Sequence, residues 1–229
     1  PAWAFPGVHA GIDRLEAKGI AHPLLPHGRV ANDVTVGPPG TFLLVTGSNM
    51  SGKSTLLRAI GTNAVLAGAG APVCGQSLCM PPVTIGTSGH VEDSLAEGVS
   101  FFMAELQRLK QVVDVASATR EAGGRFLFLL DEILQGTNTA ERQIAARRII
   151  QHLLTQGAIG AVSTHDLTLA ETASLRAAAR PIHFRETFET GPAGATMSFD
   201  YLAREGIATS SNALRLMELV GLDIGRDEE

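Results

Sequence analysis

The stretch LLVTGSNMSGKSTLLRAI, from Leu43 to Ile60, joins an apolar run, a small polar loop and a helical pattern. Its centre, Gly47 to Ser54, matches the pattern G-x-x-x-x-G-K-[ST]. Glycines at these two places let the backbone curl around an anion, while successive N–H groups and the start of the next helix face it. The stretch therefore predicts a strand, a phosphate-binding loop and a helix. A chance glycine-rich turn is the weaker reading, because both flanking elements are where the motif requires them.

The residue types in this loop predict the contacts of a nucleoside triphosphate. Lys53 is expected to reach the β- and γ-phosphates, and the Ser54 hydroxyl is expected to ligate Mg²⁺. The residues predicted to contact the nucleotide are Gly47, Ser48, Asn49, Met50, Ser51, Gly52, Lys53, Ser54 and Thr55.

The most apolar run of the chain, 126–130, is followed directly by an acidic pair in the segment FLFLLDEI. Asp131 is expected to hold Mg²⁺, directly or through water, and Glu132 to polarise the water that attacks the γ-phosphate. Two exposed carboxylates at the end of a strand are the structural alternative. The phosphate loop upstream favours the catalytic interpretation.

A third apolar run, AVSTHDL, also ends in polar residues. His165 in this run is predicted to donate a hydrogen bond to the γ-phosphate or to the attacking water, and a purely structural histidine is the alternative. The remaining histidines show no ligand spacing and are expected to be structural or exposed: His9, His22, His27, His90, His152 and His183.

Composition narrows the class of protein. The 229 residues suffice for one large domain, and 45% apolar with 18% charged residues is globular. A formal net charge of −5 is unfavourable for wrapping nucleic acid, since phosphate contacts need clustered Lys and Arg. Any contacts with DNA are therefore expected mainly from regions outside this chain.

Cellular location is predicted from cysteines and hydropathy. Cys74 and Cys79 lack the further ligands of a zinc site and are expected to be reduced thiols, as in a cytosolic protein. No apolar run reaches the roughly 18 residues that cross a bilayer, and the start is not a signal peptide. We therefore expect a cytoplasmic protein without a membrane segment here. The chain begins with Pro1 rather than Met, so we expect a piece of a longer protein, and membrane association through a preceding part stays open.

Strands alternate with helices along most of the chain, which predicts an α/β fold with a mostly parallel sheet flanked by helices on both faces. We expect one domain over residues 1–229, with a lead-in segment at 1–40, a phosphate-loop core at 41–203 and a C-terminal helical segment at 205–225. The expected strands cover 29–36, 41–47, 82–86, 126–130 and the start of 157–167; the expected helices cover 53–70, 96–116, 140–157 and 211–221, and 182–190 with 195–206 form a hairpin.

Four segments, TGSNMSGKST, EDSLAEGVSFFMAEL, LLDEILQGTNT and VSTHDL, resemble the ATPase domain of the MutS family in order and spacing. The resemblance covers nearly the whole chain, and the Asn-Met inside the phosphate loop is quite specific to this family. It implies the ABC-ATPase-like type of P-loop fold and ATP hydrolysis with Mg²⁺. The LSGGQ-type signature of transporter ATPases and of chromosome-organising ATPases is missing, which argues against both of these classes of ATPase.

The resemblance also implies roles for residues that spacing alone does not single out. Ser100 matches the serine that reaches the γ-phosphate across a dimer, although a solvated residue at a helix start is the alternative. The segment 136–139, which contains Asn138, resembles the loop that links the two sites of the dimer, with Asn138 near the partner. Asn32 and Asp33 resemble the stretch near the adenine. The segment 211–221 resembles the family's dimer contact, and the alternative is that it covers its own core.

Several positions depart from the usual mismatch-repair pattern. Ser48 and Ser51 stand where the family usually has Pro and Gly, and Phe101 stands where its signature usually has Thr. Leu134, Gln135 and Asn138 also differ. These changes keep the ATP chemistry but resemble the MutS-related paralogues more closely.

The expected function is an ATP- and ADP-binding ATPase module that forms a homodimer with composite sites. Its nucleotide cycle would switch the dimer and couple to binding of mismatched or other DNA, in mismatch repair or a related process. The alternative is a nucleotide-gated structural or scaffold module of a paralogue without mismatch recognition. The mismatch-reading domain itself is not in this sequence.

Overall fold

The computed structural model describes residues 2–26, 28–89, 101–134, 139–170, 172–191 and 194–207. Several predictions lie outside these residues: those for Ser100, Asn138, His27 and His90, the start of the helix expected from residue 96, and the closing helix at 211–221.

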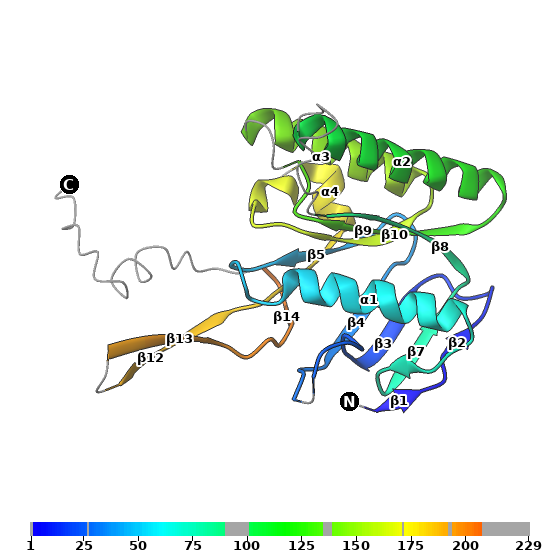
Figure 1. Ribbon diagram of the computed structural model, residues 1–229. Coiled ribbons are helices and arrows are strands. Elements are labelled where there is room, and N and C mark those ends of the chain that lie inside the picture. Colours follow the sequence, from blue (N-terminus) through cyan, green and yellow to red (C-terminus); the bar gives the residue numbers. More distant parts are fainter. Residues whose placement is uncertain are drawn as a thin grey trace.

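A six-stranded sheet runs through the centre in the order β14-β11-β5-β10-β9-β8 (Figure 1). Neighbouring strands from β11 to β8 are parallel, and β14 pairs antiparallel with β11. The predicted α/β class is confirmed, and β5, β9 and β10 fall where the apolar runs placed them. The strands are β5 (Phe42–Thr46), β8 (Val83–Ser88), β9 (Arg125–Asp131), β10 (Ile159–Ser163), β11 (Ala179–His183) and β14 (Arg204–Glu205).

Helices cover both faces of this sheet. Helix α1 lies on one face, and α2, α3 and α4 lie on the other (Figure 1). All five residues of β5 are buried, because Leu43 and Val45 pack toward α1 while Phe42 and Leu44 pack toward α2 and α3. This burial on both faces explains the continuous apolar run of that strand. The helices are α1 (Lys53–Gly68), α2 (Phe101–Glu121), α3 (Thr139–Thr155) and α4 (Ala173–Ala178), with a short 3₁₀ turn at Leu167–Ala170.

A second sheet, in the order β2-β7-β3-β4, packs on the other side of α1 (Figure 1). The prediction of a single strand at 29–36 was incomplete, since that strand begins at Asn32 and three others join it. Buried Leu15 and Ala17 alternate with exposed Glu16 and Lys18, a period-two pattern that the turn-rich surroundings obscured. The strands of this sheet are β2 (Gly7–Val8), β3 (Leu15–Ile20), β4 (Asn32–Val36) and β7 (Ser77–Met80). Strands β1 (Trp3–Ala4) and β6 (Val73–Cys74) pair antiparallel in a separate two-stranded sheet.

The predicted hairpin exists but is shorter. Strands β12 (Glu186–Gly191) and β13 (Gly194–Phe199) pair antiparallel with each other and project from the body (Figure 1). Ile182 and His183, expected in the hairpin, instead belong to β11 and pair with Val45 and Thr46. Strand β12 begins only three residues after the end of β11, so composition alone did not separate these two strands.

Two further features bear on the predictions. Both cysteines are free thiols, Cys74 buried and Cys79 partly exposed. None of the helices in the described ranges is long and apolar enough to cross a bilayer.

Candidate active site

The loop between β5 and α1 has the backbone that its glycines predict. Gly47 has φ of 138° and Gly52 has φ of 112°, both in the region that favours glycine. A Cβ on Gly47 would lie 2.8 Å from the backbone oxygen of Phe184, so a side chain there would clash. No side chain caps α1 at Gly52. The loop and the start of this helix are therefore suited to an anionic ligand.

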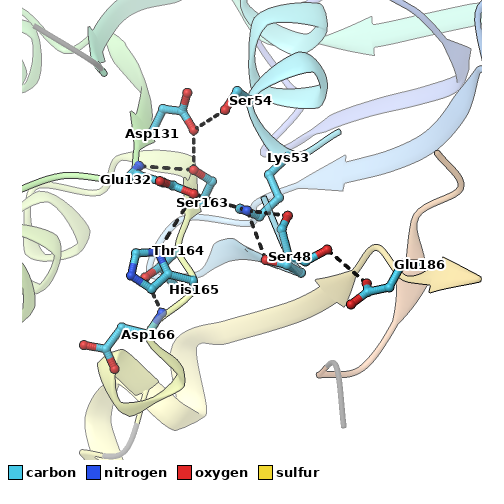
Figure 2. Close-up of polar contacts among 11 residues, drawn as sticks. Ser48, Lys53, Ser54, Asp131, Glu132, Ser163, Thr164, His165, Asp166 and Glu186 are labelled. Atoms are coloured by element: carbon cyan, nitrogen blue, oxygen red, sulfur yellow. Dashed lines mark hydrogen bonds and ion pairs between the residues drawn. The ribbon is translucent and has the colours of Figure 1, made fainter. Parts of the chain in front are cut away.

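Lys53 places its ammonium inside this loop. Its Nζ donates hydrogen bonds to the backbone oxygens of Gly47 at 3.0 Å and Ser48 at 2.9 Å, and lies 3.2 Å from Oε1 of Glu132 (Figure 2). The Lys53 side chain is only 4% exposed. A buried cation needs such partners, and these three oxygens hold the charge where the motif requires it.

Asp131 joins the loop to the central sheet. Its Oδ1 accepts a hydrogen bond from Ser54 Oγ at 3.0 Å and another from Ser163 Oγ (Figure 2). Ser163 is opposite Asp131 in the parallel pairing of β10 with β9. The backbone N–H of Glu132 donates to the backbone oxygen of Ser163 at 3.1 Å, which keeps the acidic pair in register with the end of β10.

The oxygens of Ser54 and Asp131 fit a magnesium ion. Hydroxyl and carboxylate oxygens are hard ligands, and Mg²⁺ is commonly held by one or two carboxylates together with substrate phosphates. No group of three or more His, Cys, Asp or Glu side chains with metal-binding geometry occurs in the described ranges. A site built from Ser54 and Asp131 therefore relies on phosphate and water for its remaining ligands.

Glu132 and His165 meet at the ends of adjacent strands. Nδ1 of His165 lies 4.0 Å from Oε1 of Glu132, and the imidazole is 52% exposed. Glu132 has φ of 47°, which is uncommon for a residue other than glycine. Such a backbone conformation costs free energy and is often found at functional sites.

The turn after Glu132 is held by a residue that the sequence reasoning missed. The backbone N–H of Leu134, whose φ is 63°, donates to Oε1 of Glu105 in α2. Glu105 is only 3% exposed. A glutamate in the middle of an amphipathic helix has no local mark of this role, because its partner is distant in sequence.

The loop that carries His165 is fastened to α3 by the next residue. Oδ2 of Asp166 accepts from Nε2 of Gln143 at 2.9 Å, and Oδ1 accepts from the Thr168 backbone N–H at 3.0 Å. Burial raises the pKa of Asp166, but hydrogen bonds from Thr168 and Gln143 and the charge of Arg142 outweigh it and lower the pKa below its usual value. The ionised carboxylate therefore anchors this loop.

A cavity of about 780 Å³ opens beside the phosphate loop. Its wall combines Lys53, Ser54 and Glu132 with Asn32 from the lead-in segment and Tyr201 from the segment after β13. The lining residues of the phosphate loop and early α1 also include Asn49, Met50, Gly52 and Thr55. The cavity has the size of an ordinary small-molecule site.

Asn32 lines the cavity, and its side chain fixes the opposite wall. Its Nδ2 donates to the oxygen of Tyr201 at 3.0 Å, and its Oδ1 accepts from the backbone N–H of Ala203 at 2.7 Å. Asp33 points elsewhere: its Oδ1 accepts from the N–H of Gly19 at 2.7 Å, within the second sheet. Tyr201 was not predicted, and no local motif identified it.

The chain is similar in sequence to known proteins over most of its length. The chain matches the family described as MutS domain V over residues 43–224. It is 32% identical over 219 residues to the DNA mismatch repair protein MutS 2 of Halobacterium salinarum, covering 93% of this chain and 24% of that protein. It is 28% identical over 218 residues to the DNA mismatch repair protein MutS of Thermotoga maritima, covering 92% of this chain and 26% of that protein. The chain thus spans about a quarter of the length of the curated relatives it matches.

Proposed function

Since the chain belongs to the MutS family, we propose that it is the Mg²⁺-dependent, ATP-binding and ATP-hydrolysing module of a MutS-like protein. The observation that carries this proposal is the meeting of two distant segments beside a glycine loop: Lys53 and Glu132 line one cavity 3.2 Å apart, and Asp131 accepts a hydrogen bond from Ser54 of that loop. We assign the fold to the ABC-ATPase-like branch of P-loop proteins. The parallel order from β11 to β8 and the strand–loop–helix at β5 and α1 support that assignment.

The phosphates of ATP would occupy the loop, where they meet backbone N–H groups and the start of α1. Lys53 would turn from the backbone oxygens of Gly47 and Ser48 to the β- and γ-phosphates, exchanging neutral acceptors for charged ones. Ser54 and Asp131 would hold Mg²⁺, which supplies neutralisation of phosphate charge when bound. The rest of the nucleotide would extend along the wall formed by Asn32 and Tyr201.

The carboxylate of Glu132 is the group that can accept a proton from an attacking water. In the structure the ammonium of Lys53 forms an ion pair with this carboxylate. If the ammonium turned to the phosphates, an oxygen of Glu132 would be released. His165, in the loop after β10, would donate a hydrogen bond to the γ-phosphate or to the water. Glu105 and Ser163 would hold the backbone around Glu132 in place.

Within this proposal the module works as a dimer switch. Ser100 and Asn138 would complete the site of a partner chain, and ATP-driven closure would couple to DNA bound by other parts of the protein. The net charge of −5 supports a site for DNA outside this chain. The process served is mismatch repair or a related one.

Calorimetry of Mg-ATP binding to the parent and to Lys53→Ala tests the proposal. Removing a charge-assisted contact is expected to weaken binding by about 1.5–3 kcal/mol, or roughly tenfold or more. Lys110→Ala is the matched control, because the Lys110 side chain is largely exposed, at 73%, and pairs only with Asp114 one helical turn away. Equal ATP affinity of the parent and Lys53→Ala would overturn the proposal.

A further inference from the structure

Glu186 brings a carboxylate to the phosphate loop from outside the cavity. Ser48 Oγ, in the loop, donates a hydrogen bond to Oε2 of Glu186 at 3.0 Å (Figure 2). Glu186 is the first residue of β12, where the projecting hairpin begins. None of the roles described above uses this contact. The resemblance to the family does not predict it either, since proline, which lacks a hydroxyl, usually stands in place of Ser48.

Ser48 links that carboxylate to the ammonium of Lys53. The same serine accepts from Lys53 Nζ through its backbone oxygen at 2.9 Å and donates to Glu186 through its hydroxyl. Two hydrogen bonds and one residue therefore separate the two charges. The Debye length at physiological ionic strength is about 8 Å, so salt only partly screens charges that are linked through a single residue.

The backbone keeps Glu186 at this place. The N–H of Phe184 donates to the oxygen of Thr46 at 3.0 Å, which extends the pairing of β11 with β5 up to the loop. The backbone oxygen of Phe184 also lies against Gly47, leaving no room for a side chain there. The root of the hairpin is thus packed directly on the phosphate loop, and its carboxylate is part of the loop's electrostatic surroundings.

We propose that Glu186 is a specificity-determining residue, which lowers the preference of the loop for ATP over ADP through its seat on Ser48. The inference rests on the proposed function and deepens it. ATP carries one more negative charge than ADP, so a fixed carboxylate near the loop opposes ATP more strongly. It acts against Lys53 and limits how tightly the triphosphate is held.

The test measures dissociation constants for Mg-ATP and Mg-ADP by calorimetry on the parent and on Glu186→Gln. The glutamine still accepts from Ser48 but carries no charge. We expect tighter binding of both nucleotides, and a rise of about threefold or more in the preference for ATP. This is the size that Coulomb's law gives for one unit charge at such a separation, with an effective dielectric constant between those of water and of a protein surface. The rise should shrink at high salt.

Three further variants separate charge from structure. Glu186→Asp keeps the charge and should keep the parent preference. Glu121→Gln makes the same charge change at the last residue of α2, far from the phosphate loop, and should leave the preference unchanged. In a Ser48→Ala background, Glu186→Gln should change the preference for ATP over ADP less, because the hydroxyl that holds the Glu186 carboxylate is absent. Thermal unfolding of each variant checks that it folds.

The outcomes are distinct. If the parent binds both nucleotides and Glu186→Gln leaves their ratio unchanged, the inference is wrong and the proposed function stands. Weaker binding of both nucleotides at the parent ratio would show a structural role only, which also overturns it. If the parent binds neither nucleotide, the proposed function fails and the inference fails with it.

Discussion

The ammonium of Lys53 and the carboxylate of Glu132 lie 3.2 Å apart, between Nζ and Oε1, although they come from different segments of the chain. Each group stabilises the charge of the other at a site where Lys53 is almost fully buried. An incoming phosphate would compete with Glu132 for the ammonium. Ligand binding and release of the carboxylate are therefore coupled through one ion pair.

Glu132→Gln is expected to retain ATP binding and to slow hydrolysis by about 100-fold or more, since an amide cannot accept the proton. Single-turnover hydrolysis, with protein in excess over ATP, separates the chemical step from binding. Glu121→Gln, at the end of α2, is the control. Hydrolysis at the parent rate in Glu132→Gln would mean that another group activates the water.

Ser163→Ala is expected to raise the Mg²⁺ concentration needed for half-maximal ATP hydrolysis. The change removes the hydrogen bond that orients Asp131, a contact to a charged group worth about 1.5–3 kcal/mol. ATP binding without Mg²⁺ should change little, and that measurement serves as the internal control. Ser117→Ala, which removes a hydroxyl bonded to a helix carbonyl, should behave as the parent does. An unchanged Mg²⁺ requirement would rule out this role for Ser163.

Tyr201→Ala is expected to weaken ATP binding about tenfold, because the aromatic side chain at the cavity can pack on the base. Tyr201→Phe keeps the ring and should bind nearly as the parent does. Inorganic triphosphate, which has no base, should bind both variants equally. A loss of triphosphate affinity in Tyr201→Ala would point instead to a disturbed phosphate loop, since the ring lies close to Gly52.

The ion pair between Asp200 and Arg204 predicts a pH dependence of stability. The hydrogen bond from Arg204 lowers the pKa of Asp200 from its usual range to about 2, although partial burial opposes the shift. The ionised carboxylate therefore contributes stability that is fully present above about pH 5 and is lost as pH falls toward 2. After discounting for solvent screening, Asp200→Asn should cost up to about 1 kcal/mol at neutral pH. Urea unfolding from pH 2 to pH 7 checks this, and the two curves should converge at the acid end. A constant difference across the range would contradict the assignment.

Mixing Ser100→Ala with Lys53→Ala tests the composite site that the family resemblance predicts. In the mixed dimer one site carries both changes and the other carries neither, so ATPase activity should return relative to each variant alone. Activity per chain of the parent should also rise with protein concentration. Flat activity across the monomer–dimer transition, with no recovery on mixing, would show that each chain works alone.

The strand–loop–helix around Gly47–Ser54, the strand that ends at Asp131 and the α/β class were predicted from the sequence, and the resemblance to the MutS family is confirmed. The roles of the loop and of the acidic pair in ATP chemistry stay predictions. The second sheet was largely missed. Its strands are short and separated by proline and glycine turns, and β7 is far from β3 and β4 in sequence. These distant strands pair where they pack together on α1. The periodicity of a single segment does not indicate such a pairing.

The loop between β5 and the start of α1 could be predicted from the sequence, because its glycines, which allow positive φ, and its lysine lie within a few consecutive residues. The supporting contacts could not. Glu105, Ser163, Glu186 and Tyr201 reach the site only through strand register and helix packing, which bring together groups far apart in sequence. Their side chains are ordinary for a helix, a strand or a hairpin. It is the folded backbone that supplies each with its partner, and so the orientation of the chemistry belongs to the tertiary structure.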